Sequence, residues 1–177
     1  MASKCFTYDE WKARREKSTH NWHRYFLDLA HHVSLKSKDP STKTGAVIVR
    51  PDRTIVSTGY NGFNKFGPDD ASLYDNREEK YSNIIHAEMN AVLHARTDLK
   101  DCTLYGTGCP CERCVVHMIQ AGIRHFVWWE DTPDMLSRWG DGFKKSVMRM
   151  RDAGCSTLMV PLKFRAEIVP NEDYFQR

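Results

Sequence analysis

Apolar residues recur at three- and four-residue spacings across residues 22–35. In this segment Phe26, Ala30 and Val33 would share one face of a helix. The pattern ends near Pro40, which is surrounded by serine and threonine. The spacing therefore predicts an amphipathic helix that packs against the core.

Two short segments after this helix predict a hairpin. Residues 45–49 are small or apolar and predict a buried strand, and a turn sequence at 51–53 separates them from a second strand at 54–58. Residues 59–83 are mostly polar and are interrupted by glycine and proline, so the pattern predicts a loop there. Loops of this length are uncommon in compact domains unless they serve a function.

The second half of the chain alternates between helical and extended patterns. The predicted helices cover residues 86–96, 111–121 and 142–153, and the predicted strands cover residues 103–105, 125–129 and 157–160. Alternation of this kind is typical of parallel strands joined by crossover helices, whereas the leading hairpin adds an antiparallel pair. We therefore expect an α/β fold, a three-layer α/β/α sandwich around a mixed five-stranded sheet.

The length of 177 residues fits one domain, 1–177. We expect an N-terminal helical extension at about 7–35, which begins at a capping-box sequence at 7–10, and a C-terminal tail at 161–177. The first twenty residues contain no apolar signal-peptide core, and no apolar run is long enough to span a membrane. We therefore expect a cytoplasmic protein with no membrane partner.

Charge and cysteine content narrow the chemistry. The formal net charge is only +3, which argues against a dedicated nucleic-acid binder because such proteins usually carry a basic stripe. The chain has six cysteines, which in a reducing compartment are thiols or metal ligands rather than a disulfide framework. Three of them, Cys109, Cys111 and Cys114, lie close together.

Two motifs predict a catalytic zinc site. The first is His86-Ala87-Glu88, and the second runs from Pro110 through Cys111 to Cys114. Cys111 and Cys114 are three residues apart at the start of a predicted helix, where they share a face and where the helix dipole stabilises thiolates. With His86 they supply three ligands for one Zn²⁺ per subunit and leave the fourth position to water, as catalytic sites do.

Glu88 is the candidate proton carrier of this site. It lies two residues from His86, beside the predicted water rather than on the metal, where it would take a proton and pass it to the substrate's ring nitrogen and then to the leaving amine. A Cys-x-x-Cys pair alone is equally typical of redox or structural zinc sites. The combination of His-x-Glu with Pro-Cys-x-x-Cys is the signature of zinc deaminases, and favours the catalytic interpretation.

Segments spread over most of the chain resemble the deoxycytidylate deaminase family. The matching segments are 37–42, 59–63, 77–81, 86–91, 110–114 and 119–123. The zinc motifs are common to a wider superfamily, whereas Gly-Tyr-Asn-Gly and Ser-Lys-Asp-Pro are typical of its nucleotide branch. The resemblance implies hydrolytic deamination of dCMP to dUMP with release of ammonia, which supplies dUMP for thymidylate synthesis.

The resemblance also implies a set of substrate contacts. Asn61 matches the family asparagine that hydrogen-bonds the nucleoside, although Asn-Gly is equally a turn signal. The loop residues Ser37, Lys38 and Ser41 are candidates for the 5′-phosphate, against the alternative of a solvated loop. The other residues that we expect at the substrate are Ala87, Tyr81 and Pro110, with core packing as the alternative for Tyr81.

Further implications concern effectors and assembly. In regulated members of the family, the loop after Gly62 helps to bind dCTP or dTTP together with Mg²⁺. Here the loop has a different sequence at 63–67, so the resemblance leaves regulation open. The resemblance also implies a homo-oligomer, a hexamer or a dimer, in which neighbouring subunits complete the pocket.

Three other functions remain open at the level of sequence. The substrate could be another cytosine nucleotide, such as dCTP, CMP or a modified dCMP. An editing deaminase for tRNA or single-stranded DNA would need a cationic, aromatic groove. The only basic cluster, Lys12, Arg14, Arg15 and Lys17, is interrupted by Glu16 and fits a solvated helix face. A zinc module without catalysis is disfavoured by Glu88.

Some cysteines and tryptophans lie close to these motifs without matching them. Cys109 lies two residues before Cys111, and we expect it to line the pocket rather than to bind the metal. The remaining cysteines are expected in the core. Trp128, Trp129 and Trp139 could stack on a base, but packing in the core or between subunits is the expected role.

Overall fold

The computed structural model describes residues 21–68, 70 and 72–165. Its first element is helix α2 (Trp22–Ser34), which begins where the side chain of Asn21 accepts a hydrogen bond from the Arg24 amide at 3.2 Å. The predicted capping box at 7–10, the basic cluster at 12–17 and most of the predicted tail lie outside the described residues.

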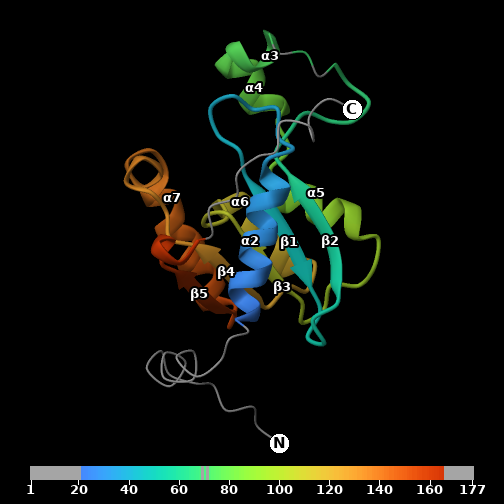
Figure 1. The fold of residues 1–177 in the computed structure, drawn as a ribbon, viewed down its shortest axis with the longest axis vertical. Helices are drawn as coiled ribbons and strands as arrows, with labels where there is room; N and C mark the ends of the chain where they lie inside the picture. The colour runs from blue at the N-terminus through green and yellow to red at the C-terminus, as the bar shows by residue number, and fades with distance from the viewer. Residues whose placement is uncertain (1–20, 69, 71, 166–177) are drawn as a thin grey trace, which may run out of the picture.

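A mixed five-stranded sheet forms the centre of the molecule (Figure 1). Its strands are β1 (Gly45–Val49), β2 (Ile55–Tyr60), β3 (Thr103–Gly106), β4 (His125–Trp129) and β5 (Ser156–Val160), in the order β2-β1-β3-β4-β5. Strand β1 pairs antiparallel with β2 and β3, whereas β3, β4 and β5 are parallel to one another. The predicted mixed sheet, with an antiparallel hairpin and a parallel half, is confirmed.

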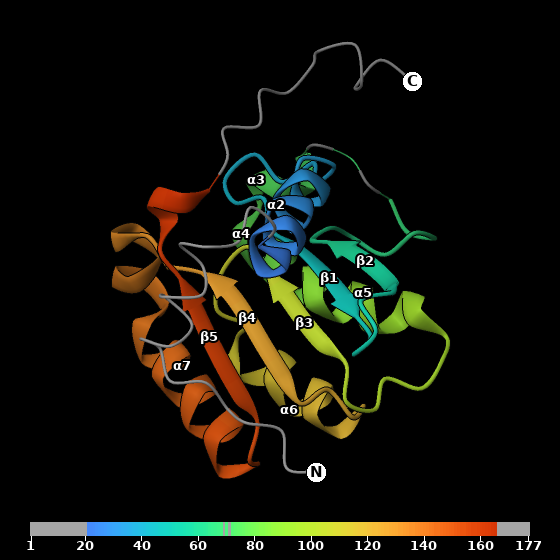
Figure 2. The ribbon, with the colours of Figure 1, turned by 60° about the horizontal axis from the view of Figure 1, so that its bottom comes forward.

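Helices cover both faces of this sheet and complete the three predicted layers (Figure 2). Helix α2 lies on one face, and its Phe26, Leu27 and Ala30 pack with strand residues such as Trp129. The opposite face carries α5 (Ala87–Ala95), α6 (Glu112–Gln120) and α7 (Pro133–Asp152). Because strand side chains alternate between faces, neighbouring strand residues belong to different cores.

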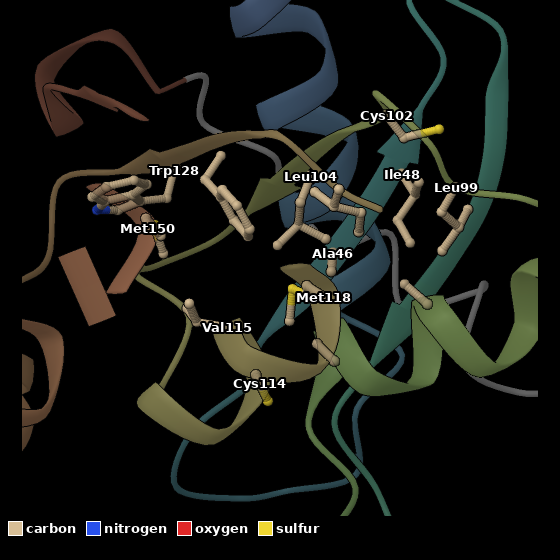
Figure 3. Packing of buried hydrophobic residues seen from close by; sticks show 14 of the residues in the cluster. Ala46, Ile48, Leu99, Cys102, Leu104, Cys114, Val115, Met118, Trp128 and Met150 are labelled. Carbon is tan, nitrogen blue, oxygen red and sulfur yellow. The ribbon is translucent and has the colours of Figure 1, made fainter. Parts of the chain in front are cut away.

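The core on the α5–α6–α7 side directly underlies the predicted zinc motifs. Ile48 and Leu104 of the sheet pack there against Val115 and Met118 of α6, and Cys114 lies at the edge of the same cluster (Figure 3). Trp128 belongs to this core, and Trp129 belongs to the core beneath α2. Both tryptophans therefore have the expected packing role.

Glycine allows helix α5 to approach the sheet closely. A Cβ atom on Gly59 of strand β2 would lie 2.2 Å from the carbonyl oxygen of Ala87 and 2.4 Å from the amide nitrogen of Ala91. The hydroxyl of Ser57 also donates to the Ala91 carbonyl at 2.7 Å. These contacts fix the first turn of α5, and with it His86, relative to the sheet.

Two expectations about the elements are wrong. The predicted loop at 59–83 contains the short helices α3 (Ser72–Asp75) and α4 (Arg77–Asn83), and Asn76 caps α4 by accepting from the amides of Glu78 and Glu79. Helix α7 begins at Pro133 rather than at 142. Its cap is Thr132, and a proline in the first turn is favourable because no helical donor is lost there.

The chain continues past β5 into a short 3-10 turn, η1 (Leu162–Phe164), before the described part ends. Within the described residues, no helix combines the length and the apolar character needed to cross a bilayer.

Candidate metal centre

Two helix N-termini meet at the predicted zinc motifs. His86 is the N-cap residue of α5 and Cys111 is the N-cap residue of α6, and both have extended backbone angles. Neither side chain caps its own helix. Instead both are directed to a common point, and Cys114 reaches the same point from the first turn of α6.

The distances within this cluster match a tetrahedral zinc site. The Nδ1 atom of His86 lies 3.5 Å from the Sγ of Cys111 and 3.5 Å from the Sγ of Cys114. Zinc bonds of about 2.3 Å to sulfur and about 2.0–2.1 Å to nitrogen, at a tetrahedral angle, place these atoms about 3.5–3.6 Å apart. The three residues therefore fit a zinc ion bound through Nδ1 of His86.

This cluster is the only group of metal-binding type found among the described residues. His86 is exposed, Cys111 is half-buried and Cys114 is buried, so the cluster opens to solvent on the histidine side. Three protein ligands with one open side are the arrangement of a catalytic rather than a structural zinc site. Cys109 is buried but is not part of the cluster.

The protonation of the cluster is shared among its members. A hydrogen bond from Cys114 and the nearby His86 lower the pKa of Cys111 to about 4. The Cys111 thiolate in turn raises the pKa of His86 to about 9, and the same thiolate and burial raise the pKa of Cys114. Because zinc binds cysteine as thiolate and histidine as neutral imidazole, metal binding to this cluster would release protons.

Glu88 lies in the first turn of α5, two residues after His86. Its side chain is half-buried, and burial raises the pKa of its carboxyl while the charge of His86 opposes that shift. A carboxyl with a raised pKa is suited to accept a proton and to return it near neutral pH.

Asn61 and His86, the predicted metal ligand, lie on segments that a backbone bridge joins. Gly62 and Ile85 exchange backbone hydrogen bonds of 3.1 and 2.8 Å in an isolated antiparallel bridge, and Asn61 and His86 adjoin this bridge on the same side. The Asn61 side chain is 4% exposed and accepts from the Thr44 amide at 2.8 Å. Asn61 and Gly62 do not form a turn, since Gly62 takes part in the bridge to Ile85, and the substrate contact of Asn61 stays a prediction.

The loop that carries Ser37, Lys38 and Ser41 lies next to Asn61. Ser37 is buried and its hydroxyl donates to the Asn61 carbonyl at 2.8 Å, whereas the Ser41 hydroxyl donates to Asp39 at 2.9 Å. Lys38 is exposed on the same loop. Both serine hydroxyls thus take part in contacts within the protein, and Lys38 is one of three exposed lysines on the segment between α2 and β1, with Lys36 and Lys43.

The remaining predicted substrate residues occupy different environments. Ala87 and Pro110 are buried beside the two ligand-bearing segments. Tyr81 is 48% exposed, not part of the core, and its ring makes an edge-to-face contact with Trp139 of α7 at 6.2 Å. The Arg77 side chain donates to the Tyr81 hydroxyl at 3.2 Å.

Two buried charged residues near the site were not predicted. Asp131 follows β4 and accepts from the Cys109 amide at 2.9 Å, which fixes the loop that leads to Cys111. Burial raises the pKa of Asp131. Lys80, in α4, forms a buried ion pair with Asp39 at 2.8 Å. Neither residue belongs to a recognisable sequence motif. A charged residue in a polar segment is usually exposed to solvent, so the sequence does not indicate that these two are buried.

A cavity in the described part of the structure lies away from the cluster. Its volume is about 580 Å³, and it is lined at the amino ends of β3, β4 and β5 by residues that include Thr103, His125 and Ser156. The two cysteines of the cluster follow the opposite, carboxyl end of β3. No lining residue of the cavity is a member of the cluster, so the cavity is not the reaction site.

The fold and the His–Cys–Cys cluster, with a glutamate two residues after the histidine, are those of the zinc-dependent deaminase class. The chain belongs to the cytidine and deoxycytidylate deaminase family, because the family model for the cytidine and deoxycytidylate deaminase zinc-binding region matches residues 20–130.

Individual relatives agree with this assignment. The chain is 42% identical over 141 residues to an uncharacterized deaminase of Aliivibrio fischeri, which covers 80% of this chain and 95% of the relative. It is 36% identical over 116 residues to the deoxycytidylate deaminase of Homo sapiens, which covers 62% of this chain and 65% of the human protein. The match thus spans less than two thirds of the human enzyme.

Solved structures support the fold. The dCMP deaminase of cyanophage S-TIM5 in its apo form superposes with a TM-score of 0.60 at 20% identity, covering 78% of this chain and 96% of the phage chain. The same phage enzyme in complex with dCMP and dUMP gives a TM-score of 0.55, with 88% and 100% coverage.

Proposed function

We propose that the chain catalyses the zinc-dependent hydrolytic deamination of dCMP to dUMP and ammonia, and thereby supplies dUMP for thymidylate synthesis. The observation that carries this proposal is the preformed cluster of His86, Cys111 and Cys114, with Glu88 on the adjacent helical turn. The relatives named deoxycytidylate deaminase support dCMP as the substrate.

The proposed chemistry divides between the metal and the protein. His86, Cys111 and Cys114 would hold one Zn²⁺, which when bound lowers the pKa of water to about 7 and so provides a nucleophile at neutral pH. Glu88 accepts the proton that this water loses and delivers it to the ring nitrogen of cytosine. It then transfers the second proton of the water to the leaving amine, so that one water and one dCMP become dUMP and ammonia.

We propose that the substrate contacts come from both sides of the metal. Asn61, which adjoins the same backbone bridge as His86, would hydrogen-bond the nucleoside, since its Oδ1 has two lone pairs and the Thr44 amide uses one of them. Lys38 would supply the charge for the 5′-phosphate, with Ser37 and Ser41 shaping that loop. Tyr81, Ala87 and Pro110 would form the walls around the base and the sugar.

Assembly and regulation are further parts of the proposal. Helices α6 and α7 carry large apolar side chains with substantial exposure, among them Val116, Leu136 and Met148, which supports a homo-oligomeric interface on this side of the molecule. In the loop after Gly62, Phe66 is 90% exposed. An effector nucleotide, dCTP or dTTP with Mg²⁺, would use this loop.

Ammonia release from a panel of cytosine compounds tests the proposed substrate. The panel consists of dCMP, CMP, dCTP, deoxycytidine and a cytosine-containing oligonucleotide, each with and without dCTP or dTTP as effector. Rapid turnover restricted to dCMP is the expected result. Turnover of the triphosphate or the oligonucleotide with dCMP inert would retain the zinc chemistry and contradict the substrate.

A further inference from the structure

A buried ion pair connects helix α4 to the loop before β1. The Lys80 side chain is 11% exposed and that of Asp39 is 2% exposed, and the ammonium lies 2.8 Å from the carboxylate. The same ammonium donates to the Ser41 hydroxyl at 2.6 Å. Burial alone would raise the pKa of Asp39, but hydrogen bonds from Lys80, Ser41 and Thr42 outweigh it and lower that pKa.

A buried ion pair of this kind contributes little to the free energy of unfolding. Removing two charges from water costs about as much free energy as their mutual attraction returns, so an apolar pair of similar volume would serve the fold equally well. A pair that is nevertheless accompanied by this many hydrogen bonds is better explained by the geometry that it imposes on its neighbours.

The neighbour that this geometry fixes is Asn61. Asp39 accepts from the Asn61 Nδ2 at 3.3 Å, in addition to the Ser41 amide, the Ser41 hydroxyl and the Thr42 amide. The other hydrogen on Nδ2 is donated to the Thr42 carbonyl at 2.9 Å. These bonds direct Nδ2 of Asn61 toward Asp39 and the Thr42 carbonyl, while Oδ1 faces the Thr44 amide, and they prevent the side-chain amide from rotating.

The same network reaches the metal ligand through the backbone. The backbone carbonyl of Lys80 accepts from the Ile84 amide at the end of α4, and Ile85 then pairs with Gly62 before the chain reaches His86. Two connections therefore link the segments of Asn61 and His86: one runs through the Lys80 ammonium and Asp39, and the other through the backbone at the end of α4, which any residue at position 80 would supply.

We infer that Lys80 is a positioning residue for the reaction: through Asp39 it holds the amide of Asn61 in the orientation that binds the nucleoside beside His86. The inference rests on the proposed function because Asn61 acts there as a substrate contact. Lys80 itself touches neither the substrate nor the metal. Its loss affects substrate binding more than the chemical step, because His86, Cys111, Cys114 and Glu88 are on other elements.

Steady-state kinetics with dCMP test this inference in four variants. Lys80→Met should raise KM about tenfold, the size expected for a misplaced hydrogen bond, while zinc content stays at one per chain and kcat changes less than about threefold. Lys80→Arg, which keeps the charge and the donors, should restore much of the lost affinity. Lys144→Met, which removes an exposed ion pair with Asp141, is the matched control and should leave KM unchanged.

The double variant Asp39→Leu/Lys80→Met separates positioning from stability. It leaves no buried charge unpaired, so its thermal midpoint should recover relative to Lys80→Met, whereas KM should remain high because nothing orients Asn61. Recovery of KM together with stability, or a Lys80→Met variant with normal KM, would overturn the inference. If Lys80→Met does not fold, Lys80→Arg and the double variant still provide both outcomes.

A binding measurement distinguishes this inference from the proposed function. Calorimetric titration of dCMP into zinc-loaded Glu88→Gln protein, with and without Lys80→Met, measures affinity without turnover. Weaker binding of dCMP by Glu88→Gln/Lys80→Met than by Glu88→Gln supports the positioning role. This holds even if the wild-type chain deaminates no nucleotide, and that absence of activity would contradict only the proposed function. Equal Kd values, or no binding of dCMP, would overturn the inference.

Discussion

The Nδ1 atom of His86 lies 3.5 Å from the Sγ of Cys111, although 25 residues separate the two in the chain. The contact exists because both residues are N-caps whose helices start side by side on the same face of the sheet. Each helix is fixed by its packing on the sheet, so the ligand atoms are held near their bonding positions by the fold itself.

Removal of a ligand should abolish metal binding while preserving the fold. Cys111→Ser exchanges a soft thiolate for a weakly bound hydroxyl, so zinc affinity should fall by more than about a hundredfold. Cys155→Ser is the matched control, because Cys155 is half-buried outside the cluster. Elemental analysis after dialysis against a chelator should give one zinc per chain in the control and none in Cys111→Ser. Retention of zinc by Cys111→Ser would remove this residue from the ligand set.

Glu88→Gln should separate metal binding from catalysis. The amide has nearly the same shape but cannot carry a proton, so turnover of dCMP should fall by about 10²–10⁴-fold with zinc content and thermal midpoint unchanged. Glu78→Gln, on the exposed surface of α4, is the matched control and should retain wild-type rates. Near-normal activity of Glu88→Gln would eliminate Glu88 from the mechanism.

The close approach of α5 to β2 predicts opposite results for the same substitution at two glycines. Gly59→Ala would place a methyl group against the Ala87 carbonyl and displace the helix that begins at His86, so we expect a loss of about 1–3 kcal/mol in unfolding free energy and weaker zinc binding. Gly142→Ala lies in α7 with no atom near its new methyl group and should stabilise by up to about 1 kcal/mol. Denaturant unfolding with zinc titration measures both, and a neutral Gly59→Ala would contradict the described packing.

The lowered pKa of Asp39 predicts a specific loss of stability in acid. Because the folded-state pKa is below the unfolded value of about 3.9, the ionised Asp39 stabilises the fold above that value, and the contribution disappears as pH falls through the folded-state pKa. Asp39→Asn lacks the charge at every pH. Thermal midpoints should therefore differ between wild type and Asp39→Asn at pH 6 and converge as the pH falls through the folded-state pKa of Asp39. A difference that is constant across this range would contradict the assignment.

The sheet and the metal cluster could be predicted because their signals are local. Short apolar runs bounded by turn residues indicated the strands, helical spacing indicated the main helices, and the spacing of Cys111 and Cys114 implied a shared ligand face. The predicted helix at 142–153 lacks the first nine residues of α7, which begins at Pro133 and includes Gly140, a position where a Cβ atom would meet no other atom. Helices α3 and α4 are short and polar, so they lack an apolar period.

The supporting residues of the site could not be predicted from sequence alone. Lys80 and Asp39 are 41 residues apart, and only the fold shows that each charge is buried against the other. From the sequence, Asp131 is likewise only a polar residue that follows a strand, and its contact with the Cys109 amide is visible only in the structure. Long-range partners of single charged residues leave no periodic signal, whereas metal ligands on one helix do.

The most direct test of the account is simultaneous measurement of dUMP and ammonia from dCMP by the zinc-loaded protein, with the chelated protein and Glu88→Gln as controls. The account predicts equimolar dUMP and ammonia from the zinc-loaded wild type and almost none from either control. Absence of dUMP from zinc-replete protein, or undiminished product after zinc removal, would contradict it.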